Sequence, residues 1–139
     1  FIIKTKSMRI FPPTKIFVSK SEVHGYGVFA RGYIIEGEII EECPIHDLKI
    51  PKGEVSEVLI DYRFNWPQGT DFWDKQVLSW GWGCLYNHSD TPNALWRTNL
   101  ENQTFEFYAL RDIKPYEEIF TYYGGEGYWL DGRTHTQVK

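Results

Sequence analysis

The stretch of sequence that decides the fold is Gly83-Cys-Leu-Tyr-Asn-His-Ser-Asp-Thr-Pro-Asn93. Its polar residues and its proline are typical of a turn. An isolated histidine such as His88 is more often a structural hydrogen-bonding group than a ligand. Asn87-His88-Ser89 also has the form of an N-glycosylation acceptor, although no secretory signal accompanies it. By itself, therefore, this stretch predicts only a turn.

Two further motifs lie on either side of this stretch. His24-Gly25-Tyr26-Gly27 falls between two short β-rich runs, and its glycines allow positive φ angles and a close approach of the backbone to a ligand. It lacks the third glycine and the following helix of a dinucleotide-binding fingerprint, so a plain tight turn is the simpler interpretation. Glu118-Ile-Phe-Thr-Tyr-Tyr-Gly124 predicts a strand that ends in paired tyrosines. Such an end is either the edge of an aromatic core or a place from which a phenol hydroxyl enters a cleft.

The composition narrows the class of protein. The 139 residues fit one domain, and 42% hydrophobic with 24% charged residues is ordinary for a globular protein. A net charge of −4 argues against direct nucleic-acid binding, which requires a basic face. No apolar stretch approaches the roughly 18 residues of a membrane span. The histidines and cysteines have no metal-ligand spacing, so we expect no metal site, and we expect Cys43 and Cys84 to be buried, reduced thiols.

Short strands account for most of the remaining pattern. Residues 38–43 are one strand candidate, and residues 94–97 and 104–110 form a predicted hairpin whose second arm alternates apolar and polar side chains. Residues 31–39 echo residues 111–119, since each segment has a turn followed by Glu-Ile and a strand, and the simple interpretation is a pair of similar β-turns. The whole pattern predicts a compact, mainly β domain with little helix.

In chain order, the motifs at residues 24–27, 83–93 and 118–124 together resemble the SET-domain protein lysine methyltransferases. Residues 21–30 are similar to the first motif of that family, residues 36–39 to its Gly-Glu turn, and residues 83–93 to its Asn-His-Ser segment. The resemblance covers residues 16–130. The ending Gly127-Tyr-Trp-Leu130 is most similar to the stand-alone SET proteins of large algal viruses.

This resemblance implies a fold and a division of the chain. Small curved β-sheets surround a pseudoknot, in which Tyr122-Tyr123-Gly124 passes against the Asn87-His88 loop, and such threading is rare in proteins. A lead-in would occupy residues 1–15 and the SET domain residues 16–130. A short tail over residues 131–139 would follow, without the zinc-binding cysteine cluster of many eukaryotic members.

The resemblance also implies a cofactor and a site. The methyl donor would be S-adenosylmethionine, and the acceptor the ε-amine of a lysine in a protein or peptide. Tyr123 would be catalytic, with Tyr62 beside both cofactor and substrate lysine.

Thr121 stands where many members have Phe or Tyr, at a position that influences how many methyl groups are added. Tyr116 replaces a glycine of the family's second Gly-Glu-Glu turn, so we expect that turn to differ in conformation. The residues expected to bind the cofactor are His24, Gly25, Tyr26, Tyr62, Asn87, His88 and Trp129.

The chemistry implied by the resemblance suits these residue types. Methyl transfer is an in-line displacement that needs alignment of amine, methyl group and sulfur, but neither a strong acid nor a metal. The Tyr123 hydroxyl can orient the methyl group and the sulfonium as charge redistributes. Desolvation lowers the pKa of the lysine amine, so no dedicated base is required.

A histone tail is the first substrate that the viral resemblance suggests, and the viral relatives also suggest a homodimer. The acidic stretch 36–47 either faces a basic peptide or is a solvated strand edge. We expect a soluble intracellular protein with no membrane partner, located in a host nucleus if the substrate is a histone. The alternative function is a catalytically inactive SET fold that binds peptides or assembles with partners. The joint presence of Tyr123, Asn87 and His88 argues against that alternative.

Overall fold

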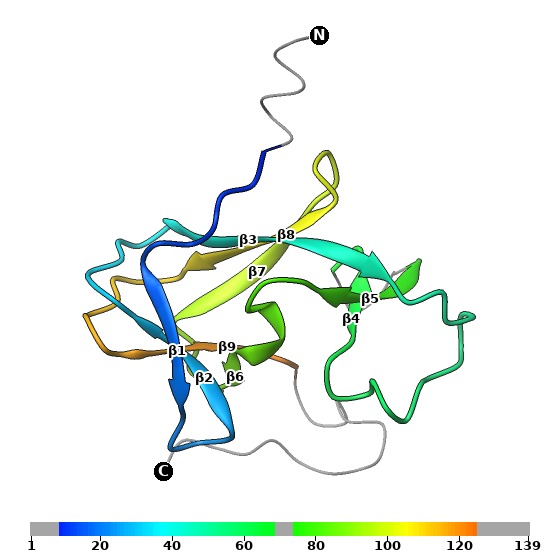
Figure 1. Cartoon of the computed structure of the whole chain (residues 1–139), viewed down its shortest axis with the longest axis horizontal. Coiled ribbons are helices and arrows are strands. Elements are labelled where there is room, and N and C mark those ends of the chain that lie inside the picture. The colour runs from blue at the N-terminus through cyan, green and yellow to red at the C-terminus, as the bar shows by residue number, and fades with distance from the viewer. Residues whose placement is uncertain (1–8, 69–73, 125–139) are drawn as a thin grey trace, which may run out of the picture.

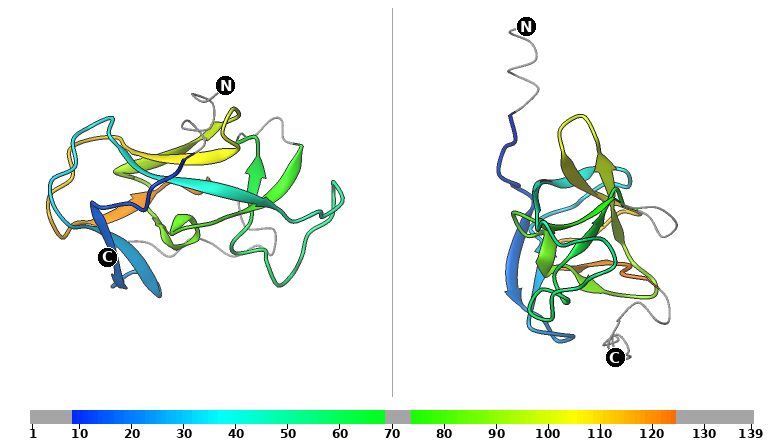
Figure 2. Two further views of the ribbon diagram at one scale, coloured as in Figure 1. Left: turned by 45° about the horizontal axis from the view of Figure 1, so that its top comes forward. Right: turned by 90° about the vertical axis from the view of Figure 1, so that its right-hand side faces the viewer.

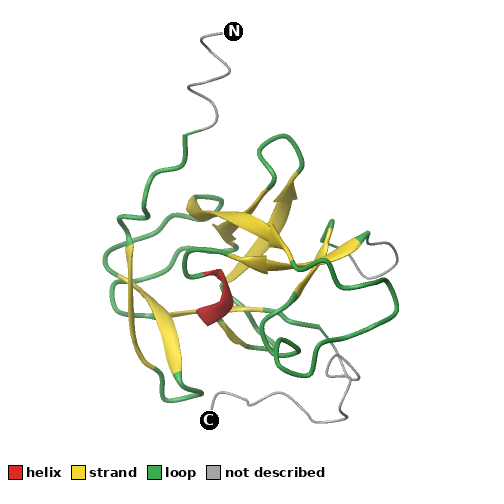
Figure 3. Ribbon diagram, turned by 45° about the vertical axis from the view of Figure 1, so that its right-hand side comes forward, coloured by secondary structure: helices red, strands yellow, loops and turns green. Residues whose placement is uncertain are grey.

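The computed structural model describes residues 9–68 and 74–124. These residues form nine strands and one short 3-10 helix, so the prediction of a mainly β chain with little helix is confirmed (Figures 1 and 3). Within the described residues, no helix is long and apolar enough to cross a membrane. The elements are β1 Ile16–Lys20, β2 Tyr26–Ala30, β3 Ile39–Asp47, β4 Phe64–Trp66, β5 Lys75–Ser79, η1 Gly83–Leu85, β6 Asn87–His88, β7 Ala94–Asn99, β8 Thr104–Ala109 and β9 Glu118–Thr121.

The larger sheet has five strands in the order β4-β5-β3-β8-β7, all antiparallel. Its β7–β8 pair is the predicted hairpin, with Ala94 opposite Ala109. The predicted alternation along β8 is also confirmed, because Phe105, Phe107 and Ala109 are buried in the core while the side chains between them are half-buried. A strand with one face against the core must bury every second residue, and this requirement fixes the register.

The central place of β3 in this sheet corrects the interpretation of one residue of the acidic stretch, Glu41. Glu41 on β3 is only 4% exposed, and the neighbouring Glu42 is half-buried. Glu41 therefore belongs neither to a solvated edge nor to a surface that could face a basic peptide. Of the two cysteines, Cys43 is buried and Cys84 is half-buried, and both are free thiols. Burial raises the pKa of both thiols, which suppresses their reactivity.

The smaller sheet has the order β1-β2-β9-β6 and brings the three sequence motifs together. β2 begins within the first motif, β6 belongs to the second, and β9 to the third. β9 lies between β2 and β6, antiparallel to β2 and parallel to β6. In the parallel pair Asn87 is opposite Phe120 and His88 is opposite Thr121. Segments about thirty residues apart are thus aligned at the place where the resemblance puts the site.

The repeated segments are related by an approximate two-fold arrangement. Ile34 and Ile113 form an antiparallel bridge, and the two loops lie side by side at one end of the molecule (Figures 1 and 2). The N–H of Gly37 donates to the carbonyl of Ala109 (2.8 Å), and the N–H of Tyr116 donates to the carbonyl of Ala30 (2.7 Å).

The Tyr116 turn keeps the conformation of its glycine counterpart. Tyr116 has φ +67° and Gly37 has φ +84°, so both residues lie in the left-handed region. The expected difference from the family's Gly-Glu-Glu turn stays a prediction. The equivalent hydrogen bonds of the two turns hold the backbone in the left-handed region even where a side chain makes that region unfavourable.

Candidate active site

The side-chain amide of Asn87 connects all three motifs. Asn87 is only 6% exposed, and its Nδ2 donates to the carbonyl of His24 (3.0 Å), the carbonyl of Tyr26 (3.3 Å) and Oε2 of Glu118 (2.9 Å). A buried amide with these acceptors fixes the backbone of the turn between β1 and β2. The Asn87 side chain therefore fixes the backbone of that turn from the buried side, and does not extend to the exposed side of the turn.

The carboxylate of Glu118 also holds the turn. We call the side chains of Asn87, Glu118 and Ser21, with their hydrogen bonds, the clamp on the turn. Its carboxylate accepts from the Ser21 hydroxyl (2.8 and 2.9 Å), and Ser21 Oγ in turn accepts from the N–H of Val23 (3.0 Å). The carboxylate can lie here only because residue 27 is glycine, since a Cβ on Gly27 would stand 2.3 Å from Glu118 Oε2. The need for this glycine is thus a need for close approach and not for flexibility.

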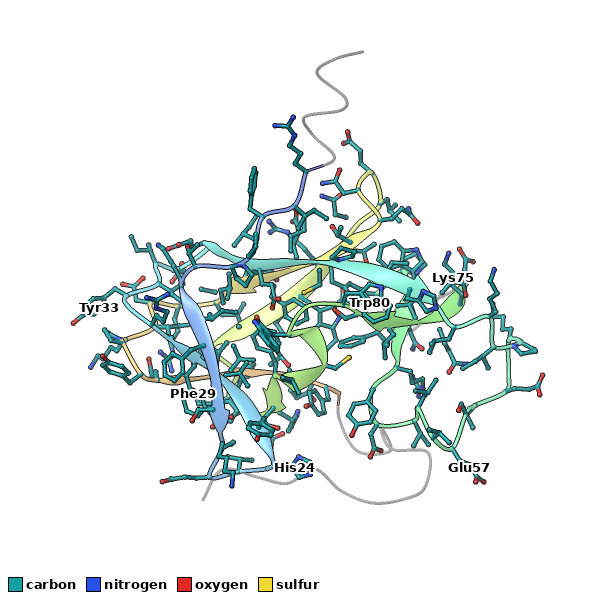
Figure 4. The ribbon with its side chains drawn as sticks, in the orientation of Figure 1. His24, Phe29, Tyr33, Glu57, Lys75 and Trp80 are labelled. Atoms are coloured by element: carbon teal, nitrogen blue, oxygen red, sulfur yellow. The ribbon has the colours of Figure 1, made fainter. Side chains whose placement is uncertain are left out.

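The clamped turn is exposed to solvent. His24, Gly25 and Tyr26 are all exposed, and Gly25 has φ +48°. Figure 4 shows His24 near the end of the β1–β2 hairpin, away from the core. The turn therefore combines a fixed backbone with accessible polar groups and one accessible aromatic ring, that of Tyr26.

Both ring nitrogens of His88 make hydrogen bonds within the protein. Its Nδ1 accepts from the backbone N–H of Tyr123 (3.0 Å), and its Nε2 lies 2.8 Å from Oδ1 of Asp90. Because Nδ1 accepts, the ring hydrogen is on Nε2 and the ring is neutral. With a side chain only 2% exposed, His88 positions the third motif through its ring.

The predicted catalytic tyrosine enters a cleft from the end of β9. Its hydroxyl donates to the carbonyl of Tyr86 (2.5 Å). Thr121, the small residue that the resemblance links to methyl number, is buried and lines the same cleft. The residues that line the cleft are Asp61, Tyr62, Arg63, Phe64, Gly83, Cys84, Tyr86, Thr121 and Tyr123.

The structure thus brings most predicted site residues into two neighbouring places. Tyr62 and Tyr123 share the cleft, although 60 residues separate them in the chain. His24, Gly25 and Tyr26 form the exposed turn, and Asn87 and His88 connect the turn to β9. Trp129 lies outside the described residues. No group of three or more potential metal ligands occurs in residues 9–68 and 74–124.

Two supporting groups were missed by the sequence interpretation. Asn93 is 2% exposed and holds β9 with both ends of its amide: Nδ2 donates to the carbonyl of Glu118 (2.9 Å), and Oδ1 accepts from the N–H of Phe120 (2.7 Å). The other is the buried pair of Glu41 and Tyr86, joined by a 2.8 Å hydrogen bond. An asparagine directly after a proline indicates a turn, so the local pattern gave no sign that Asn93 also holds β9.

Comparison with known proteins decides the family. The SET domain family model matches residues 25–124, which is most of the chain and includes every predicted site residue that the structure describes except His24. This chain belongs to the SET-domain family. The family match and the relatives described below support lysine methylation in general.

Two curated relatives of this SET-domain chain are histone-lysine N-methyltransferases. It is 33% identical over 119 residues to the H3 lysine-37 specific enzyme of Schizosaccharomyces pombe, and the match covers 82% of this chain and 76% of that protein. It is 30% identical over 127 residues to TRX1 of Oryza sativa subsp. japonica, with 85% of this chain but only 12% of that protein covered.

A solved structure agrees with the family assignment. The crystal structure of a candidate histone methyltransferase from Plasmodium falciparum matches with a TM-score of 0.67 and 35% sequence identity. That match covers 80% of this chain and 94% of the other. The mainly β SET fold is thereby confirmed, while the narrower likeness to stand-alone viral proteins stays a prediction.

Proposed function

We propose that this SET domain transfers a methyl group from S-adenosylmethionine to the ε-amine of a lysine in a protein substrate. One observation carries the proposal: the parallel β6–β9 pair joins the exposed turn to the cleft. Asn87, at the start of β6, holds the turn, and Tyr123, just after β9, enters the cleft. A donor on the turn and an acceptor in the cleft would be held in one rigid frame, as a displacement reaction requires.

The residues of the turn fit S-adenosylmethionine. An amino acid joined to a nucleoside offers hydrogen-bonding groups and a flat ring, which suit exposed backbone groups and an aromatic side chain. The backbone at His24 and Tyr26 is fixed by Asn87, and Gly25 leaves open space where a Cβ would be. Tyr26 is 57% exposed and offers an aromatic surface. Bound S-adenosylmethionine would supply a methyl group already activated by the sulfonium.

The residues of the cleft fit a lysine side chain. Phe64 and the rings of Tyr62 and Tyr123 suit the hydrocarbon stem and the cationic head of lysine. The Tyr123 hydroxyl gives its hydrogen to the Tyr86 carbonyl, and a hydroxyl that donates to one partner presents its oxygen as an acceptor to others. Such an oxygen can orient the attacking amine and the transferring methyl group. Withdrawal of the amine from water lowers its pKa and favours its nucleophilic form.

A histone tail is the substrate that the relatives favour. Two of them carry histone-lysine methylation in their names, and the net charge of −4 suits a basic partner. A nuclear location would follow from a histone substrate. The inactive alternative is disfavoured because Tyr123 is present in the cleft with its hydroxyl oriented.

Two measurements test the proposal. Titration calorimetry should show binding of S-adenosylmethionine, and a labelled methyl group should then pass from it to histones or lysine-rich peptides. Binding without transfer would favour the inactive module. If neither occurs, the proposed function is wrong.

A further inference from the structure

Glu41 is a buried carboxylate that belongs to neither the exposed turn nor the cleft lining. It lies on β3 and is 4% exposed. Oε1 accepts from the hydroxyl of Tyr86 (2.8 Å), and Oε2 accepts from the backbone N–H of Trp82 (2.9 Å). Burial raises the pKa of this carboxyl, and hydrogen bonds from the Trp82 N–H, the Tyr86 hydroxyl and the Cys43 side chain act in the opposite direction. A carboxylate placed so deeply needs such partners, so the hydrogen bonds from Tyr86 and Trp82 are structurally important.

The two donors stand near opposite ends of one connector, residues 80–86 between β5 and β6. Between them lies η1, closed by the N–H of Leu85 donating to the carbonyl of Trp82 (2.8 Å). The connector passes close over the carboxylate, because a Cβ on Gly81 would stand 2.5 Å from Oε2, and Gly81 has φ +66°. Three residues of this connector line the cleft: Gly83, Cys84 and Tyr86. Glu41 therefore fixes one wall of the cleft from behind.

The link to the proposed reaction runs through Tyr86. Its ring is 1% exposed and stacks on Phe107, with ring centroids 4.4 Å apart and planes 12° apart. Its hydroxyl is held by Glu41, and its backbone carbonyl accepts the hydroxyl of Tyr123. Burial and the nearby Glu41 carboxylate raise the pKa of Tyr86 well above its usual value, so its hydroxyl keeps its hydrogen and stays a donor.

We propose that Glu41 is a positioning residue for methyl transfer: by holding the Tyr86 ring and the Trp82 N–H, it fixes the carbonyl that orients the Tyr123 hydroxyl. The inference rests on the proposed function. It explains why a carboxylate stands in the middle of the sheet, where an apolar side chain would be expected.

A glutamine cannot replace this carboxylate fully. The N–H of Trp82 can only donate, so the glutamine oxygen must face it. The glutamine NH₂ then faces the Tyr86 hydroxyl, whose own hydrogen loses its acceptor inside the protein. Glu41→Gln therefore keeps the shape and the Trp82 bond, and removes the acceptor that orients the Tyr86 hydroxyl.

The neighbouring Glu42 provides a matched control. Its Oε2 also accepts two hydrogen bonds, from the hydroxyl of Thr104 (2.6 Å) and Nδ2 of Asn102 (3.0 Å). Neither partner lines the cleft. Glu42→Gln thus removes a carboxylate of the same strand with a similar number of bonds and no path to Tyr123.

The experiment compares wild type, Glu41→Gln, Tyr86→Phe, the double variant and Glu42→Gln. Steady-state methyl transfer to a histone peptide, calorimetry with S-adenosylmethionine and thermal melting are measured for each. We expect kcat to fall about tenfold in Glu41→Gln, because a displacement of well under 1 Å of an aligning group is enough for such a loss. KM for the peptide and Kd for the cofactor should stay within about twofold. The double variant should be no slower than the slower single variant, since both act through one hydrogen bond.

The outcomes separate the claims. If wild type transfers no methyl group, the proposed function fails, and this inference fails with it. If wild type is active and Glu41→Gln turns over at the same rate, only the inference fails. It also fails if Glu42→Gln loses as much kcat as Glu41→Gln, or if the double variant shows the product of the two single losses.

Discussion

The backbone N–H of Tyr123 donates to Nδ1 of His88 across 3.0 Å, so the Asn-His-Ser segment holds the tyrosine that we propose to be catalytic. The opposite ring nitrogen of His88 is held by Asp90 at 2.8 Å, which fixes the ring orientation. The rings of His88 and Tyr123 are also in contact, with centroids 5.3 Å apart. The histidine of the Asn-His-Ser segment thus acts on the tyrosine through its side chain.

This relationship predicts different effects for two substitutions at residue 88. His88→Ala removes the acceptor and leaves a buried cavity, so it should lower stability by about 2–4 kcal/mol and kcat by at least about tenfold. His88→Asn places an amide oxygen near the position of Nδ1 and should retain most of the activity. Urea unfolding and methyl-transfer rates measure both. Equal impairment of the two variants would show that the hydrogen bond to Tyr123 is unimportant.

Gly27 should tolerate no side chain. In Gly27→Ala the new Cβ would be 2.3 Å from Glu118 Oε2 and 3.1 Å from Asn87 Nδ2, so the clamp on the turn must shift. We expect a loss of about 1–3 kcal/mol in stability and weaker binding of S-adenosylmethionine by calorimetry. The control is Gly32→Ala, where nothing lies within 4 Å of the added Cβ, and stability should be unchanged or raised by up to about 1 kcal/mol. Similar effects of the two variants would contradict the clamp.

The turns at Gly37 and Tyr116 predict opposite changes in the free energy of unfolding when their residues are exchanged for Ala and Gly. Tyr116 has φ +67°, which costs a non-glycine residue about 1–2 kcal/mol. Tyr116→Gly also loses the edge contact with Phe17, whose ring centroid is 6.3 Å away, worth up to about 1 kcal/mol, so the net gain should be about 0–2 kcal/mol. Gly37→Ala should lose about 1 kcal/mol because its φ is +84°. Chemical denaturation checks both signs, and a destabilised Tyr116→Gly would mean that the turn is unstrained.

Glu106 predicts a defined dependence of stability on pH. Burial alone would raise the pKa of its carboxyl, but hydrogen bonds from Arg97 (2.7 Å) and Asn99 (3.0 Å) outweigh burial and lower it from 4.5. A folded-state pKa below the unfolded value means that the stabilisation is complete above about pH 4.5 and is lost as the pH falls through the folded-state pKa. Glu106→Gln should therefore be less stable than wild type near neutral pH, by about 0.5–1 kcal/mol after allowance for solvent screening.

The check is urea unfolding at several pH values. The stability difference between Glu106→Gln and wild type should shrink towards zero in acid, because protonated Glu106 no longer gains from Arg97. The exposed Glu101→Gln serves as the control for a change of one charge on the same hairpin. A difference that stays constant down to strongly acidic pH would contradict the assigned ion pair.

Local pattern was sufficient to predict the mainly β class, the β7–β8 hairpin and the alternation along β8. Each of these depends on residues close together in the chain and on one buried sheet face. The order of the motifs was sufficient to predict the family. Tyr62 and Tyr123 were assigned to one site through the resemblance alone, and the structure places both in the same cleft.

What the sequence could not predict depends on contacts between distant segments. Glu41 and Tyr86 are 45 residues apart, and a glutamate in an acidic run is normally a surface residue. Only the pairing of β3 between β5 and β8 puts that glutamate inside the protein. In the same way, the strain at Tyr116 follows from its backbone bond to Ala30, which no local pattern indicates.

The central claim is most directly tested by labelled methyl transfer to core histones, followed by mass spectrometry of the labelled residue. Wild type, Tyr123→Phe and the neighbouring Tyr122→Phe should be compared at equal cofactor occupancy. Tyr122 is 39% exposed and is not part of the cleft lining. We predict methylated lysine from wild type and from Tyr122→Phe, and a loss of at least about 100-fold in rate for Tyr123→Phe with little change in cofactor affinity. Equal rates for the two tyrosine variants, or no methylated lysine from wild type, would contradict the account.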